Sequence, residues 1–375
     1  MKEQSTRNNW LECIDDKNFE NLRLPEELDS FFEIPQDLDW LTSDELSPQE
    51  RLYDGLQFTN TQASDLVNYL INNGFNTEQY TFAKFAESQS TDDTTQTKDR
   101  GTYTVIDVLS QLVFERVLDR LKQNFQEGFD GLSLSGEEKV GSLTDELSQP
   151  DNSNSQNLIR VVIDPVDGTT FITDKFLETE ENRKINYKRR NYGVVSVLQA
   201  QAQIYGFVNL PESNIRFERT LNDKVSMLKY PDTANEIDLL TDEIFLQNLD
   251  NPTTGAYVNG RVPNQVQQIL KTNGQLCSPE RSLKGRANEA VLDLVNGDIS
   301  VCAVSGKDLR DQAILEILAT MTTHFESYRT TIDGQELLVV VNKKSPKYQR
   351  IMQSLRNLYP QSGLGDQVKG LRSDL

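Results

Sequence analysis

A short apolar run leads directly into a group of carboxylate and hydroxyl residues near the middle of the chain. Residues 158–163 read Leu-Ile-Arg-Val-Val-Ile, which is typical of a buried β-strand, and the next seven residues read Asp-Pro-Val-Asp-Gly-Thr-Thr. Pro165 fixes its own φ and lacks a backbone N–H, so we expect the strand to stop there and the chain to turn into a helix. Asp164 and Asp167, three residues apart in such a turn, can converge on one point. The segment therefore predicts a buried strand that ends at a polar site.

The same segment offers the hard oxygen ligands that Mg²⁺ prefers. We expect the carbonyl of Val166 to face the same space as Asp164 and Asp167, and Gly168 and Thr169 to supply backbone N–H groups at a helix start, where an anion is favoured. Aspartate, glycine and threonine are also common in helix caps and turns. Taken alone, the segment is equally consistent with a helix cap.

The charge balance excludes polymeric anions as partners. The 375 residues include 38 Lys and Arg against 58 Asp and Glu, for a formal charge of −20. Such a chain repels nucleic acid and anionic lipid, although a bound cation could still attract a small phosphate. No apolar run approaches the roughly 18 residues of a membrane span. We therefore expect no nucleic-acid and no membrane partner, and a cytoplasmic location.

Cysteine and histidine are too few for several kinds of site. Three cysteines without CxxC spacing indicate neither a disulfide framework nor a structural zinc. His324 is the single histidine, which excludes Ser-His-Asp and multi-histidine zinc sites, and we expect its role to be structural. Any chemistry must rest on carboxylates, hydroxyls and metal.

The pattern of apolar residues divides the chain into three parts. We expect an acidic N-terminal extension over residues 1–60, an N-terminal α+β half with the metal motifs over 61–260, and a C-terminal α/β half over 261–375. Helical spacing predicts helices over 62–86, from 105, over 287–295 and over 309–321, with a turn at 296–298 between helix and strand. Alternation and turn residues predict hairpins at 192–210 and 328–341.

Four segments together resemble the motifs of the inositol monophosphatase and fructose-1,6-bisphosphatase superfamily. Residues 164–170 resemble its DP(I/V/L)DGT metal motif, and the other three follow the family's order along the chain. They are Lys98-Asp99 with Thr104-Val105-Ile106-Asp107, which resemble its K…TxxD element; Gly136-Glu137-Glu138, which resemble GEE; and Leu309-Arg310-Asp311-Gln312-Ala313, which resemble WDxA. The resemblance covers residues 98–345 and implies an α+β fold, a layered α-β-α-β-α sandwich like the sugar phosphatase fold, with mixed sheets flanked by helices.

Carried over to matching positions, the resemblance assigns roles to individual residues. The implied ligands of two or three Mg²⁺ ions are the side chains of Glu137, Asp164, Asp167 and Asp311 and the carbonyl of Val166. Asp107 and Thr169 are the implied catalytic pair, which would orient and deprotonate the attacking water. Gly168, Thr169 and Thr170 would bind the phosphate. Because family members often form homodimers and are inhibited by lithium, both properties are among the expectations.

The implied activity is Mg²⁺-dependent hydrolysis of a small phosphomonoester, such as an inositol phosphate or sugar phosphate. A 3′(2′),5′-bisphosphate nucleotidase and a fructose-1,6-bisphosphatase are alternatives, and a pseudophosphatase that only binds or regulates is the non-enzyme alternative. The chain departs from the family pattern at three places: Arg310 stands where Trp is usual, residues 322–331 lack EAGG, and Val304 stands where inositol monophosphatases carry a sugar-binding Glu. The first two, with the acidic N-terminal extension, motivate the pseudophosphatase alternative, and Val304 argues against inositol monophosphate as the substrate.

The densest basic cluster in this acidic chain follows the metal motif. It consists of Arg183, Lys184, Lys188, Arg189 and Arg190. The plain interpretation is a solvated loop that offsets neighbouring glutamates. The alternative is that Arg189 and Arg190 bind a second phosphate of the substrate through bidentate hydrogen bonds.

Overall fold

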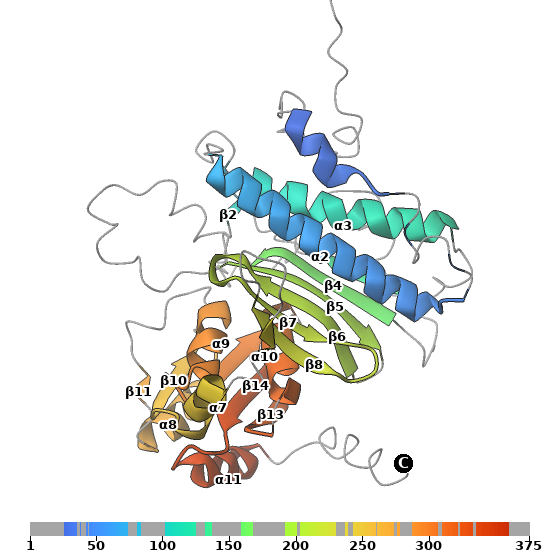
Figure 1. Ribbon diagram of the computed structural model, residues 1–375. Coiled ribbons are helices and arrows are strands. Elements are labelled where there is room, and N and C mark those ends of the chain that lie inside the picture. The colour runs from blue at the N-terminus through green and yellow to red at the C-terminus, as the bar shows by residue number, and fades with distance from the viewer. Residues whose placement is uncertain are drawn as a thin grey trace, which may run out of the picture. The chain divides into compact units, whose positions relative to one another are not determined.

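The computed structural model describes residues 26–35, 38, 43, 45–73, 81–83, 102–124, 132–136, 159–167, 192–200, 203–229, 237–238, 243–259, 261–273, 276–277, 287–306, 310–321, 323–332 and 335–359. The chain forms two compact units, Met1–Pro211 and Glu212–Leu375. Each unit has its own sheet strands and helices, and each is described separately below (Figure 1).

The first unit contains three described helices and six described strands. In chain order they are η3 (Glu26–Phe32), α2 (Pro48–Asn72), β1 (Thr81–Ala83), β2 (Thr102–Thr104), α3 (Val105–Asn124), β3 (Leu132–Gly136), β4 (Ile159–Asp167), β5 (Gly193–Ala200) and β6 (Gln203–Leu210). Strand β3 is parallel to β4, whereas β4, β5 and β6 are successively antiparallel. The helix predicted from residue 105 and the hairpin predicted at 192–210 are confirmed.

Helix α2 begins inside the segment 1–60, which we expected to be an acidic N-terminal extension. Ser47 caps it: the Ser47 Oγ accepts a hydrogen bond from the N–H of Glu50 at 3.3 Å, and the Glu50 carboxylate accepts one from the N–H of Ser47 at 2.8 Å. Pro48 occupies the first turn, where its missing N–H is harmless. This capping box starts the helix at residue 48, so the expected start at 62 was wrong.

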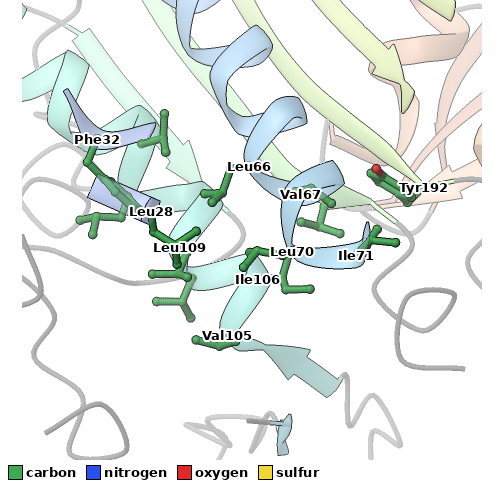
Figure 2. Packing of buried hydrophobic residues seen from close by; sticks show 14 residues of the cluster. Leu28, Phe32, Leu66, Val67, Leu70, Ile71, Val105, Ile106, Leu109 and Tyr192 are labelled. Atoms are coloured by element: carbon green, nitrogen blue, oxygen red, sulfur yellow. The ribbon is translucent and has the colours of Figure 1, made fainter. Parts of the chain in front are cut away.

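Helix α2 packs on both the sheet and α3. Figure 2 shows Leu66, Val67, Leu70 and Ile71 of α2 in one buried cluster with residues of α3 and η3. The helix also binds the sheet through polar side chains: Asn60 donates to the carbonyl of Val194 at 2.9 Å. Helices α2 and α3 thus lie over the strands of this unit (Figure 1).

The second unit holds most of the remaining elements. They are β7 (Ile215–Arg219), β8 (Val225–Lys229), β9 (Ile237–Asp238), α7 (Glu243–Asp250), β10 (Gly255–Val258), α8 (Asn264–Thr272), β11 (Leu276–Cys277), α9 (Ala287–Val295), β12 (Val301–Gly306), α10 (Arg310–Met321), β13 (Phe325–Ile332), β14 (Gln335–Asn342) and α11 (Tyr348–Leu358). The predicted helices over 287–295 and 309–321 and the hairpin at 328–341 are confirmed. The turn after α9 is also confirmed, because Gly297 has φ 74°.

A mixed sheet forms the core of the second unit. Its order is β11-β10-β12-β14-β13. Strands β11, β10 and β12 are parallel to one another, and β14 is antiparallel to both of its neighbours, β12 and β13. Val301 and Ala303 share one buried cluster with residues of α8 and α11, while α9 and α10 contact the sheet outside that cluster. Helices therefore cover both faces (Figure 1).

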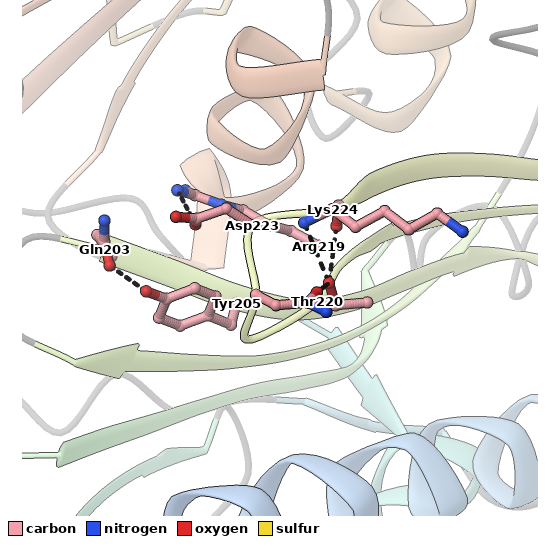
Figure 3. Close-up of polar contacts among 7 residues, drawn as sticks. Gln203, Tyr205, Arg219, Thr220, Asp223 and Lys224 are labelled. Carbon is pink, nitrogen blue, oxygen red and sulfur yellow. Dashed lines mark hydrogen bonds and ion pairs between the residues drawn. The ribbon is translucent and has the colours of Figure 1, made fainter. Parts of the chain in front are cut away.

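The strands β7 and β8 form a hairpin closed by a tight polar turn. Figure 3 shows the turn, in which Thr220 N–H donates to the carbonyl of Lys224 at 2.8 Å and Arg219 pairs with Asp223 at 2.9 Å. Asp223 takes φ 62°, a left-handed conformation that Asp tolerates. Both strands contact α10.

The contacts of α10 explain where the chain divides. Strands β7 and β8 contact α10 and belong with it to the second unit, which begins at Glu212. The expected division into parts 1–60, 61–260 and 261–375 stays a prediction. The predicted α+β class, with mixed sheets flanked by helices, is confirmed. The predicted α-β-α-β-α order joins both units and stays a prediction. Among the described helices, none has the length and apolar character needed to cross a membrane.

Candidate functional site

Residues 164–167 lie within strand β4 and not after it. The expectation that Pro165 stops the strand was wrong: β4 continues through Pro165 and Val166 to Asp167. Pairing with β5 explains this continuation, because Asp164 lies opposite Val195 and Asp167 lies opposite Gly193. On its other side, β4 is paired with β3 only up to Ile163. Pro165 thus falls beyond the end of β3, where the N–H that it lacks is not needed for that ladder.

A β-bulge places the two aspartate positions on one face of the sheet. In a regular strand, residues three apart point to opposite faces. Here the register shifts between Asp164 and Asp167. Asp164 is paired with Val195 and Asp167 with Gly193, so three residues along β4 correspond to only two residues along β5. Residues two apart on β5 share a face. The extra residue of the bulge therefore brings positions 164 and 167 to the same face.

The side chain of Asp164 is buried. It is 6% exposed, and Val166 beside it is 1% exposed. A buried carboxylate is unfavourable unless hydrogen bonds, positive charge or a metal compensate it. The neighbouring chain ends here as well, because Gly136, the last residue of β3, lies opposite Ile163. The described chain thus reaches the residue directly before Glu137 at the point where the aspartate segment begins.

Asp107 lies in the first turn of α3, as its third residue, and is 1% exposed. A carboxylate at this position is stabilised by the unpaired N–H groups and the dipole of the helix start. Every side chain from 105 to 115 is buried, since α2, β4, η3 and β2 all contact this helix. A base in such surroundings is shielded from bulk water.

Asp311 belongs to the second unit, where it is the second residue of α10. The helix start predicted at this point is confirmed. Gln312, which is fully buried, donates from Nε2 to the carbonyl of Glu336 at 3.1 Å and thereby attaches the first turn of α10 to β14. Glu316 of the same helix is paired with Arg329 of β13.

Several predicted site residues lie outside the described residues. These are Glu137, Gly168, Thr169, Thr170, Arg189 and Arg190, together with the side chains of Asp167 and Asp311. In the part of the chain that the structure describes, no three His, Cys, Asp or Glu side chains gather in a way that could hold a metal. The predicted ligand set, the Asp107–Thr169 pair and the basic cluster therefore stay predictions.

The single histidine takes part in a surface ion cluster. His324 Nε2 lies 3.2 Å from Asp250 Oδ1, and Lys344 Nζ lies 3.4 Å from the same oxygen. The hydrogen bond from Lys344, with a further one from His324, lowers the pKa of the Asp250 carboxyl. These contacts support the expected structural role.

Two buried glutamines, one in each unit, follow predicted site residues in the sequence and were given no role by the sequence analysis. Gln111, on α3, and Gln312, on α10, are both fully buried. The only sequence signal for Gln111 is its position one helical turn after Asp107, on the same helix face.

Comparison with known proteins gives structural likeness only. No family model matches the sequence, and no curated protein matches it. Among solved structures, the chain is similar to the extragenic suppressor protein SuhB from Bartonella henselae (10% identity, 81% of this chain and 98% of that chain, TM-score 0.47) and to Mycobacterium tuberculosis SuhB (14% identity, 84% and 98%, TM-score 0.46). A second structure of the Bartonella henselae protein gives a TM-score of 0.42 at 10% identity. Likeness at this level identifies neither an activity nor a substrate.

Proposed function

We propose that the chain is a Mg²⁺-dependent phosphomonoesterase that hydrolyses a small phosphorylated metabolite. The observation that carries this proposal is the bulge in β4, which brings positions 164 and 167 to one face of the sheet beside the end of β3. A bulge is a costly interruption of a strand ladder and often serves to direct a side chain at a functional site. The order of the four motifs along the sequence supports the same assignment.

The donors fit magnesium in kind. Asp164, Asp167 and the Val166 carbonyl would hold the metal, with Glu137 and Asp311 completing the set that the motif resemblance implies. All of these donors are hard oxygens, without histidine or thiolate. A ligand set of this kind favours Mg²⁺ over Zn²⁺. When bound, the metal supplies charge neutralisation at the phosphate and lowers the pKa of water.

Residues of the chain itself would position the reactants. Backbone N–H groups at Gly168, Thr169 and Thr170 would hold phosphate oxygens. The hydroxyl of Thr169 would accept a hydrogen bond from the attacking water and pass the proton to Asp107, whose buried position keeps competing water away. No covalent intermediate is required.

The test is phosphate release from p-nitrophenyl phosphate by the purified full chain. Activity should require Mg²⁺, disappear in EDTA, return when Mg²⁺ is added again, and be inhibited by Ca²⁺, which binds the same oxygens at longer distances. We also expect inhibition by Li⁺. Full activity in EDTA would refute the proposal, whereas Mg²⁺ binding without turnover of any phosphomonoester would identify a pseudophosphatase.

The substrate class is a further part of the proposal. We propose that the substrate carries a second phosphate, held by Arg189 and Arg190, because guanidinium groups bind phosphate in a bidentate manner. The double variant Arg189→Ala/Arg190→Ala should then raise KM for fructose 1,6-bisphosphate, a nucleotide bisphosphate or an inositol polyphosphate, whichever is turned over, and leave KM for p-nitrophenyl phosphate unchanged. An equal effect on both substrates, or none on either, would assign the cluster to the solvated surface.

A further inference from the structure

The side chain of Asn259 continues the hydrogen bonding of β10 beyond the end of that strand. Strands β10 and β12 are parallel, and their last paired residues are Val258 and Ala303. One further bond follows, from the N–H of Asn259 to the carbonyl of Ala303 at 3.1 Å. In a regular parallel ladder the carbonyl of Asn259 would next accept from the N–H of Ser305. That carbonyl instead accepts from the N–H of Val262 at 3.1 Å, where the chain turns away towards α8.

The amide of Asn259 replaces the peptide group that has turned away. Its Oδ1 accepts from the N–H of Ser305 at 3.1 Å, and its Nδ2 donates to the carbonyl of Ser305 at 3.0 Å. The same Oδ1 accepts from the N–H of Arg261 at 3.3 Å. Ser305 is only 2% exposed, and an unpartnered buried backbone group costs about 1–3 kcal/mol. Asparagine suits this position because aspartate would lack the donor and alanine would lack both groups.

The described contacts continue from Ser305 to the first turn of α10. Gly306, the next residue of β12, lies opposite Glu336 of β14. The carbonyl of Glu336 accepts the hydrogen bond from Nε2 of Gln312 at 3.1 Å. Gln312 directly follows Asp311 in α10. Hydrogen bonds and strand pairing within the second unit thus connect the amide that extends β10 to the helix turn of the predicted ligand.

We propose that Asn259 is a positioning residue for the first turn of α10. Its amide holds the end of β12 on the β10 side, while β14 pairs with that end on the other side and anchors α10. The contacts are independent of any activity, whereas their consequence for Mg²⁺, through Asp311, rests on the proposed function. Groups that touch a ligand residue change metal affinity by about 10- to 100-fold, so a residue that acts through β14 should change it by about three- to tenfold.

The test compares Asn259→Ala with Asn342→Ala in the full chain. Asn342 is a matched control, because its Nδ2 donates to the carbonyl of Leu249 at 2.8 Å and its Oδ1 accepts from the N–H of Lys344 at 2.8 Å. It is fully buried and is the last residue of β14, whereas the contact with α10 lies near the start of that strand. Both variants therefore remove one donor and one acceptor from backbone groups, and only one of them affects the proposed path.

Two quantities are measured: amide hydrogen exchange without metal, and the Kd for Mg²⁺ by calorimetry. The exchange of Leu315, one helical turn after Asp311, should be about tenfold faster in Asn259→Ala than in Asn342→Ala. The Kd should rise about three- to tenfold in Asn259→Ala and stay unchanged in Asn342→Ala. Equal exchange of Leu315 in the two variants, or an unchanged Kd in Asn259→Ala, would overturn the proposal.

A double-mutant cycle with Gln312→Met tests whether the two residues act along one path. If they do, the Kd of Asn259→Ala/Gln312→Met should rise no more than that of the more affected single variant. Effects that add in the free energy of Mg²⁺ binding would overturn the proposal.

A second variant keeps the proposal testable if Asn259→Ala folds poorly. Asn259→Asp keeps the size of the side chain and the acceptor, but it sets a carboxylate oxygen against the carbonyl of Ser305. It should show the same faster exchange of Leu315 and the same rise in Kd, and no change in either would overturn the proposal. Faster exchange of Leu315 in a chain whose wild type binds no Mg²⁺ would support the positioning contact and refute the proposed function instead.

Discussion

Replacing Asp164 with asparagine is the sharpest test of the site in β4. The change keeps the size of the side chain and one oxygen ligand but removes the negative charge. Because Asp164 is buried and is the first residue of the bulge, the substitution alters the electrostatics of the site and leaves the pairing with Val195 in place. A loss of activity would then report on charge rather than on fold.

The expected loss follows from the burial of the carboxylate. Two unit charges 4 Å apart attract by about 4 kcal/mol at an effective dielectric constant of about 20. Asp164 is only 6% exposed, so water screens it weakly, and the asparagine oxygen retains part of the interaction. A loss of about 2–4 kcal/mol of transition-state stabilisation corresponds to a fall of about 30- to 1,000-fold in kcat/KM.

The assay measures kcat/KM for p-nitrophenyl phosphate at saturating Mg²⁺, together with urea unfolding in EDTA. Without metal, Asp164→Asn should be as stable as the wild type or more stable, since the proposed ligand set would place several carboxylates near one another and the substitution neutralises one of them. Asp119→Asn is the control, because Asp119 is an exposed carboxylate on α3 and should change neither quantity. Activity within threefold of the wild type would refute the ligand assignment. Destabilisation in EDTA by more than about 2 kcal/mol would instead show that the carboxylate is a structural hydrogen-bond acceptor.

Three further predictions concern the scaffold. Gly297→Ala should destabilise the chain in urea by about 2 kcal/mol, because Gly297 has φ 74° and a Cβ would lie 2.4 Å from the backbone oxygen of Asn248; an unchanged midpoint would contradict the αL assignment. Cys302 is fully buried, and burial, with the nearby charge of Asp293, raises the pKa of its thiol. A Cys13→Ser/Cys277→Ser variant should therefore react with DTNB only after unfolding, and fast labelling of the native protein would contradict this. Burial, and then the like charge of Glu50, raise the pKa of Asp54 above 3.8, so its ionised form destabilises the fold at pH values above that raised pKa. Asp54→Asn should raise the free energy of unfolding at pH 7 by up to about 0.5 kcal/mol and give no gain near pH 3, and an equal gain at both pH values would exclude the ionisation.

Local pattern was enough to predict helices α9 and α10 and the hairpin of β13 and β14 in the second unit. The helix over 287–295 agrees with α9 at both ends, and the turn after it has the glycine that a left-handed residue requires. These elements depend on interactions within a few residues of each other. The predicted start of helix α2 lies too far along the chain, because the prediction used apolar spacing and not the residues that cap the helix. Ser47, Pro48 and Glu50 together form a local start signal.

The bulge in β4 could not be predicted in the same way. Residues 164–167 do not contain the information that the strand continues past Pro165, because the continuation depends on pairing with Val195 and Gly193 about 30 residues later. The sequence correctly placed two aspartates at the carboxyl end of a buried strand. The expectation that Pro165 ends the strand was wrong, because β4 continues with an extra residue to Asp167. The expected turn into a helix lies outside the described residues.

Gln111 and Gln312 show why the burial of polar residues is not predicted from the spacing of apolar residues. In the sequence each glutamine interrupts an apolar helical stripe, and an interruption of this kind normally marks an exposed position. Both are fully buried, and each donates a hydrogen bond from Nε2, to Glu115 and to the carbonyl of Glu336 respectively. The hydrogen bond of Gln312 joins α10 to β14 and so restrains the orientation of α10. The hydrogen bond of Gln111 lies within α3 and satisfies part of the buried amide without joining the helix to another element. The contact with β14 therefore holds the first turn of α10, to which Asp311 belongs, within the second unit.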